Sequence, residues 1–127
     1  MISQIEASLD FIKRHTNVSY TIDYNCQRSE IREYPGVAIR EAVINALVHR
    51  DYCFQNSCVY IHIFSDRLEI EKPGGIAGGI ALEELDGRSI RRNPLLADLL
   101  CRAGYGEKLG SGMIRIQTAL RQNGNPP

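Results

Sequence analysis

The sequence predicts an α+β domain with a mixed, largely antiparallel sheet and helices packed mainly on one of its faces. Some segments place apolar residues at helical spacing, whereas shorter segments alternate apolar and polar residues and are bounded by turn residues. The length of 127 residues suits one domain. We expect residues 1–122 to form that domain, residues 123–127 to be a tail or linker, and the whole to be part of a longer chain.

The first half of the chain predicts a helix, a hairpin and a second helix. A helix over residues 1–15 is indicated by four apolar residues at helical spacing, Ile2, Ile5, Leu9 and Ile12. Alternation predicts a strand over residues 18–26, a turn near 25–28 and a shorter strand over 29–34. Pro35-Gly36 then breaks the chain before a helix from about residue 37 to residue 50.

The second half predicts another hairpin, two glycine-rich loops and two helices. Strands over residues 57–64 and 67–71 flank a tight turn at Ser65-Asp66. The glycine-rich loops cover residues 73–79 and 104–112, and a short helical turn is expected at 82–85. Asn93 as an N-cap and Pro94 in the first turn open a helix that runs to about residue 102, and a last helix covers residues 113–122.

Composition excludes several classes of protein. No run is apolar and long enough for a membrane span, and no secretion signal opens the chain, so we expect a cytoplasmic protein. The net charge of zero argues against general duplex binding, although residues 88–127 carry a balance of +5 that suits a local phosphate site. Four cysteines without zinc spacing, expected to be buried and reduced, are Cys26, Cys53, Cys58 and Cys101.

A polar stripe marks the helix predicted over residues 37–50. Glu41, Asn45 and His49 share one narrow sector of an otherwise apolar helix, where their burial is costly unless partners satisfy them. One interpretation is a hydrogen-bonded seam against a neighbouring strand. The other is a site that holds a hard cation or a water, because Asn and Glu oxygens suit Mg²⁺. The two glycine-rich loops favour the second interpretation, since such loops let backbone N–H groups approach phosphates.

The order of these motifs resembles a known superfamily. Glu41-x3-Asn45 resembles the N-box of the GHKL ATPases, which share the Bergerat-type sandwich. Four longer segments resemble its RecG-helicase-related C-terminal branch, found in AlbA- or Schlafen-type transcriptional regulators. These segments are Arg40-Glu41-Ala42-x2-Asn45-Ala46-x2-His49-Arg50-Asp51-Tyr52, Asp66-Arg67-Leu68-Glu69-Ile70-x2-Pro73-Gly74-Gly75, Arg92-Asn93-Pro94 and Gly104-Tyr105-Gly106-Glu107-Lys108-Leu109-Gly110-Ser111-Gly112.

The resemblance implies a site for ATP and Mg²⁺. Glu41 matches the carboxylate that activates the attacking water, and Asn45 matches the Mg²⁺ ligand. Gly74 and Gly75 match the loop under the adenine, and Gly110 and Gly112 match the lid glycines near the phosphates. On charge grounds we add Arg92 and Lys108 as candidate phosphate contacts.

Lys72 departs from the pattern of this branch. It precedes Pro73-Gly74-Gly75, where the resemblance implies an Asn or Asp that accepts a hydrogen from the adenine amino group. An ammonium group has donors only. We therefore expect ATP to bind weakly and with little discrimination against guanine nucleotides.

Two functions from different classes follow from these observations. The first is an ATP- and Mg²⁺-binding regulatory module of a DNA-associated regulator, with weak hydrolysis through Glu41 and with DNA bound only by other parts of the parent chain. The second is a non-catalytic interaction or homodimerisation domain that has lost the nucleotide. The chain contains no helicase motor motif, so unwinding is not expected.

Overall fold

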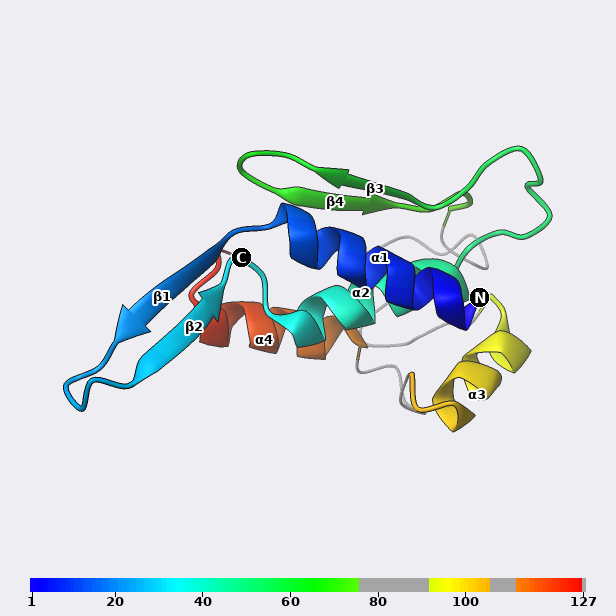
Figure 1. The fold of residues 1–127 in the computed structure, drawn as a ribbon. Helices are drawn as coiled ribbons and strands as arrows, with labels where there is room; N and C mark the ends of the chain where they lie inside the picture. The colour runs from blue at the N-terminus through cyan, green and yellow to red at the C-terminus, as the bar shows by residue number, and fades with distance from the viewer. Residues whose placement is uncertain (76–91, 106–111, 127) are drawn as a thin grey trace.

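A computed structural model describes residues 1–75, 92–105 and 112–126 of the chain (Figure 1). The α+β class is confirmed, and the four helices end within two residues of their predicted bounds. The helical turn expected at residues 82–85 lies outside the described residues. The elements in chain order are α1 (Ile2–His15), β1 (Val18–Ile22), β2 (Arg28–Arg32), α2 (Gly36–Val48), β3 (Tyr60–Ile63), β4 (Leu68–Glu71), α3 (Pro94–Arg102) and α4 (Gly112–Asn123).

Helix α2 is the centre of the fold. It lies between α1 and α4, and the β3–β4 hairpin lies over the helices (Figure 1). More than half of the buried core cluster comes from this helix, through Ile39, Val43, Ile44 and Val48. Helix α1 adds two buried isoleucines and α3 adds one buried leucine. The apolar residues that made α2 recognisable as a helix therefore also hold the other elements together.

The β3–β4 hairpin covers one side of this core. Its strands pair antiparallel, with Ile61 opposite Ile70 and Ile63 opposite Leu68, and these four side chains pack against the buried cluster. The alternate residues Tyr60 and His62 are exposed. The hairpin thus has one buried and one solvated face, as antiparallel sheets with one packed face do. The predicted turn at Ser65-Asp66 is confirmed by a hydrogen bond of 2.8 Å from Phe64 N–H to the Arg67 carbonyl.

The β1–β2 hairpin stands apart from that sheet. Instead of one mixed sheet with helices on one face, the described strands form two separate two-stranded antiparallel sheets. Strand β1 ends at Ile22 and β2 begins at Arg28, and the hairpin projects from the helices into solvent (Figure 1). Its arms carry too many charged and hydroxyl side chains to present a second apolar face to the core.

The exposure of the cysteines also differs from the sequence prediction. All four are free thiols, but Cys26, Cys53 and Cys58 are exposed and only Cys101 is partly buried. The exposed three lie outside the helices, with Cys26 in the turn of the first hairpin, and connecting segments run over protein surfaces. Among the described helices, none has the length and apolar character that a bilayer crossing requires.

Asn93 holds the end of α2 rather than capping α3. It occupies the N-cap position of α3, and Pro94 follows in the first turn, but its side chain makes no capping hydrogen bond there. Instead, its Nδ2 donates to the carbonyls of Val48 and Arg50, each at 2.8 Å. The last carbonyls of a helix lack intrahelical partners, so one amide here satisfies two such acceptors near the C-terminus of α2.

Replacing Asn93 should therefore cost more stability than an ordinary loop substitution. We expect Asn93→Ala to lower the free energy of unfolding by about 1–3 kcal/mol, because two partly buried carbonyls lose their donor. Urea denaturation followed by circular dichroism measures the change. The control is Asn56→Ala at an exposed position, which should stay within about 0.5 kcal/mol of the unsubstituted chain. Equal effects of the two substitutions would refute this role of Asn93.

Candidate functional site

Glu41 and Asn45 face the first turn of α4. A Cβ atom built on Gly112 would lie 2.8 Å from Asn45 Nδ2 and 3.3 Å from Glu41 Oε2. Real Cβ atoms do not approach other atoms as closely as the first distance, so only glycine fits at this position without a shift of Asn45. The second glycine-rich segment therefore ends directly over the two polar side chains of α2 that the sequence singled out.

Arg115 completes this polar contact between the two helices. Its guanidinium donates to Glu41 Oε1 at 3.3 Å, and the Glu41 side chain is only 13% exposed. A partly buried carboxylate requires such a partner, since an isolated charge is costly to remove from water. Arg115 was not among the predicted site residues. The sequence signal that could have identified it is its position one turn after Gly112 in the last helix, within the basic segment of residues 88–127.

A second group forms where the first glycine loop meets the end of α2. Arg92 makes an ion pair with Asp51, and its other terminal nitrogen donates to the Gly75 carbonyl at 2.8 Å. Asp51 N–H donates in turn to the Pro73 carbonyl at 3.0 Å. The guanidinium that we assigned to phosphate is thus already engaged with a carboxylate, and it fixes the loop at Gly74-Gly75.

Gly74 has a conformation that requires glycine. Its φ is +94°, in a region that L side chains rarely adopt, and a Cβ there would lie 2.7 Å from both Arg92 Nη1 and Asp51 Cβ. The loop therefore passes so close to the Arg92–Asp51 pair that a side chain at residue 74 would separate them.

Lys72 folds back onto the same loop. Its Nζ donates to the Gly74 carbonyl at 3.2 Å. Partial burial lowers the pKa of Lys72, and the neighbouring Arg92 charge lowers that pKa further. The ammonium is therefore a donor within its own loop, and it supplies no acceptor for a bound base.

The structure divides the predicted residues into two groups. Glu41, Asn45 and Gly112 lie together, and so do Lys72, Gly74, Gly75 and Arg92. Lys108 and Gly110 lie outside the described residues. The third residue of the polar stripe, His49, is the C-cap that follows α2, and its N–H donates to the Asn45 carbonyl at 2.9 Å.

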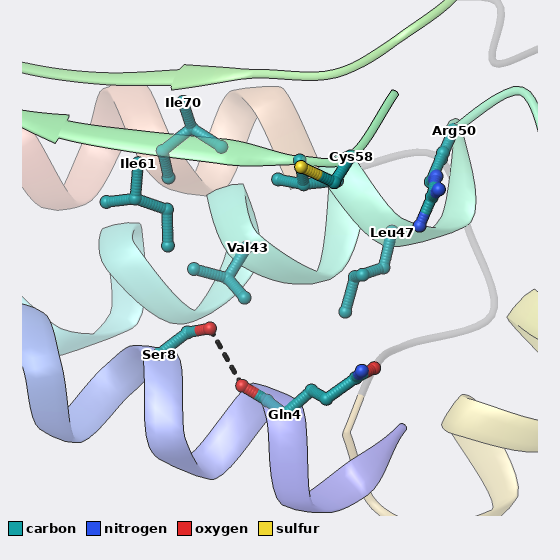
Figure 2. A pocket seen from close by; sticks show the side chains of 9 residues that line it. Gln4, Ser8, Val43, Leu47, Arg50, Cys58, Ile61 and Ile70 are labelled. Carbon is teal, nitrogen blue, oxygen red and sulfur yellow. Dashed lines mark hydrogen bonds between the residues drawn. The ribbon is translucent and has the colours of Figure 1, made fainter. Parts of the chain in front are cut away.

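A cavity of about 220 Å³ lies on the opposite side of α2 from Glu41 and Asn45. Val43 and Leu47 of α2 line it between α1 and the β3–β4 hairpin, and Figure 2 shows the Ser8 hydroxyl bonded to the Gln4 carbonyl at 2.7 Å along its α1 wall. Arg50 forms one end, with a guanidinium nitrogen 2.6 Å from the Ser57 carbonyl. This cavity contains none of the predicted site residues.

The donor set at Glu41 and Asn45 fits Mg²⁺ carried by a nucleotide. Mg²⁺ typically takes one or two protein oxygens and keeps phosphate and water oxygens as its other ligands. Within residues 1–75, 92–105 and 112–126, no group of three or more His, Cys, Asp or Glu side chains could hold an ion by itself. Asn45 offers one amide oxygen, which lies 3.2 Å from the position that a Cβ atom of residue 112 would take, so this oxygen faces the start of α4.

Comparison with known proteins gives one family and one solved fold. The family described as "Putative ATP-dependent DNA helicase recG C-terminal" matches residues 56–127, which include both glycine-rich loops, whereas Glu41 and Asn45 precede the matched segment. No curated protein sequence matches significantly.

The fold is similar to the crystal structure of the DIP2311 protein from Corynebacterium diphtheriae, with a TM-score of 0.86 and 26% sequence identity. The similarity covers 99% of this chain but only 26% of that protein, so the chain spans about a quarter of the length of its structural relative.

Gly112 provides a direct test of the contact between α2 and α4. We expect Gly112→Ala to lower the free energy of unfolding by about 1–3 kcal/mol, because the added methyl group overpacks the contact with Asn45. The matched control is Gly36→Ala, also at the first position of a helix but with nothing within 4 Å of the new Cβ. Gly36→Ala should be neutral or stabilising by up to about 1 kcal/mol. Thermal and urea denaturation distinguish the two, and similar effects would contradict the close approach.

Proposed function

Since the chain belongs to the family of RecG-related C-terminal domains, which are GHKL-like ATPase domains, we propose that it is an ATP- and Mg²⁺-binding regulatory module. The observation that carries the proposal is the position of Gly112 against Glu41 and Asn45. A carboxylate, an amide and a glycine-rich segment from distant parts of the chain meet there, and glycine-rich backbone and amide oxygens are the groups that phosphates and Mg²⁺ require.

Each residue of this group has a distinct role in the proposal. Mg²⁺ bound with the nucleotide supplies neutralisation of the phosphate charge. Asn45 would hold that ion through its amide oxygen. Glu41 would hold the attacking water and take its proton as the water oxygen bonds to the terminal phosphorus and the diphosphate leaves. Arg115 orients the Glu41 carboxylate through its hydrogen bond to Oε1.

In this proposal, the first glycine loop contacts the adenine base. The absence of side chains at Gly74 and Gly75 lets the base lie close to their backbone, while Arg92 and Asp51 hold the loop in place. Lys72 weakens recognition of adenine, because its ammonium stands where an acceptor is needed. In the second glycine-rich segment, Lys108 and Gly110 are proposed to contact the phosphates.

In this proposal, DNA is bound by other parts of a longer protein and not by this chain. The basic and acidic side chains of this chain balance, so the chain has no overall excess of the positive charge that supplies most duplex affinity. A module with slow or no turnover in a cytoplasmic transcriptional regulator would report nucleotide binding to a separate DNA-binding domain.

A second candidate is an interaction domain without nucleotide. Two observations favour it. Arg115 is paired with Glu41, the carboxylate that an ATPase would use as a free base. The ammonium of Lys72 lies in the loop where an ATPase would have an acceptor for adenine. The two candidates differ in one measurable property, which is the affinity for ATP in the presence and absence of Mg²⁺.

Asn45→Ala should weaken ATP binding only when Mg²⁺ is present. Calorimetric titration of ATP with and without Mg²⁺ should show a Mg²⁺-dependent gain in affinity for the unsubstituted chain and its loss in the variant, because the amide oxygen ligand is removed. The matched variant is Glu41→Gln, which should keep Mg²⁺-ATP affinity and lose any hydrolysis by about 10²–10⁴-fold. Absence of ATP binding by the unsubstituted chain would favour the interaction domain.

Lys72→Asn should tighten ATP by roughly ten- to hundredfold and leave GTP nearly unchanged, because the amide oxygen supplies the missing acceptor for the adenine amino group. Parallel calorimetric titrations with ATP and GTP measure the ratio of the two dissociation constants. The control is Lys72→Met, which removes the charge without adding an acceptor and should not create a preference for ATP. Tight and selective ATP binding by the unsubstituted chain would show that Lys72 does not limit recognition of the base.

A further inference from the structure

Among the strands that the structure describes, β1 pairs only with β2, and its other backbone edge has no partner strand. Hydrogen bonds of 3.0 Å at both ends of the β1–β2 ladder, from Glu33 N–H to the Asn17 carbonyl and from Asp23 N–H to the Gln27 carbonyl, show that the odd-numbered residues of this segment face β2. Backbone groups alternate in direction along a strand, so the N–H and C=O of Val18, Tyr20 and Ile22 face away from β2. Figure 1 places β1 at the outer side of the hairpin, whereas β2 lies beside the end of α4.

The two edges of this hairpin differ in charge. Strand β2 carries Arg28, Glu30 and Arg32, and charged side chains on an edge strand oppose further pairing. Strand β1 has the sequence Val-Ser-Tyr-Thr-Ile, with no charge and with four residues of types enriched in strands. Tyr20 is 53% and Ile22 is 73% exposed. An isolated two-stranded hairpin is at best marginally stable, so this uncharged edge favours a further strand.

The residue types of β1 are symmetric about its central residue, Tyr20. Read from either end, it places a β-branched apolar residue first, a hydroxyl residue second and Tyr20 in the centre. We propose that β1 pairs antiparallel with β1 of a second copy of this chain, around a two-fold axis at Tyr20. Each side chain then meets its chemical equivalent, with Val18 opposite Ile22, Ser19 opposite Thr21, and Tyr20 opposite Tyr20.

Backbone geometry fits the same register. In that pairing Val18, Tyr20 and Ile22 of each copy oppose one another, and their outward N–H and C=O groups form about six hydrogen bonds between the copies. Apolar, aromatic and hydroxyl cross-strand pairs each add to the stability of a sheet. The product is a four-stranded sheet whose outer strands are the two charged β2 strands, so association ends at the dimer.

The body of the domain leaves this edge accessible. The C-terminal segment holds the base of the hairpin through β2, where Asn123 Nδ2 donates to the Arg32 carbonyl at 3.0 Å and Asn125 Nδ2 donates to the Glu33 carbonyl at 2.7 Å. On β1, the Tyr20 ring is contacted by Arg28, whose guanidinium carbon lies 3.7 Å from the ring centroid. That contact lies within the hairpin, and none of the hydrogen bonds between described residues uses the outward backbone groups of β1.

Proline substitution on each strand tests the proposal with the full 127-residue chain. Tyr20→Pro removes the backbone N–H that points away from β2, and it leaves the β1–β2 hydrogen bonds intact. Glu30, directly opposite on β2, is the matched position, because Glu30→Pro removes a backbone N–H that points away from β1. Sedimentation equilibrium should show a dimer for the unsubstituted chain and for Glu30→Pro. For Tyr20→Pro, the dissociation constant of the dimer should rise at least about a hundredfold.

A cysteine pair provides a second test that does not depend on tolerance of proline. With the four native cysteines replaced by serine, Tyr20→Cys should oxidise to a covalent dimer, since directly opposed hydrogen-bonded residues lie about 5.5 Å apart at Cα, within the range of disulfides. Ser29→Cys on β2 should stay monomeric on a non-reducing gel. A monomeric unsubstituted chain at high concentration, open-ended association, or equal behaviour of the β1 and β2 variants would each overturn the proposal.

Discussion

The end of α2 is the constraint on which the rest of the structure depends. A helix leaves its last carbonyls without partners, and here Asn93, from a segment more than forty residues later, donates to two carbonyls at that end. The neighbouring residue Arg92 pairs with Asp51 and holds the Gly75 carbonyl. One dipeptide thus joins the end of the central helix, the first glycine loop and the start of α3, so α3 and the loop have fixed positions relative to α2.

The two sides of α2 contact different elements, and one side is apolar whereas the other is polar. Val43 and Leu47 face α1 and the β3–β4 hairpin, where burial of apolar area stabilises the fold. Glu41 and Asn45 face α4, and their burial is offset by Arg115 and by the close approach of Gly112. The site is therefore a contact between two helices, in which Gly112 lies close to the side-chain ends of Glu41 and Asn45.

The sequence predicted α1, α4 and the second hairpin because their apolar residues repeat at the period of the element they form. It predicted α2 from the break at Pro35-Gly36, and α3 from Asn93 and Pro94 at its start. It did not predict that the first hairpin stands alone, since the alternation in Val18–Ile22 has the same form in a half-buried strand and in an exposed one. The stripe of Glu41 and Asn45 was visible as polar residues on an apolar helix. The roles of Arg115 and Asn93 were not, because their partners are 74 and about 45 residues away in the chain.

In the proposed function, Asn45 and Gly112 border a site for Mg²⁺ and nucleotide. Paramagnetic broadening tests it most directly, with ¹⁵N spectra recorded as Mn²⁺-ATP replaces Mg²⁺-ATP. We expect selective broadening of the Asn45 side-chain amide and the Gly112 backbone amide, while the amide of Ser29 in the projecting hairpin stays sharp. Uniform broadening, or broadening that leaves Asn45 and Gly112 unaffected, would contradict it.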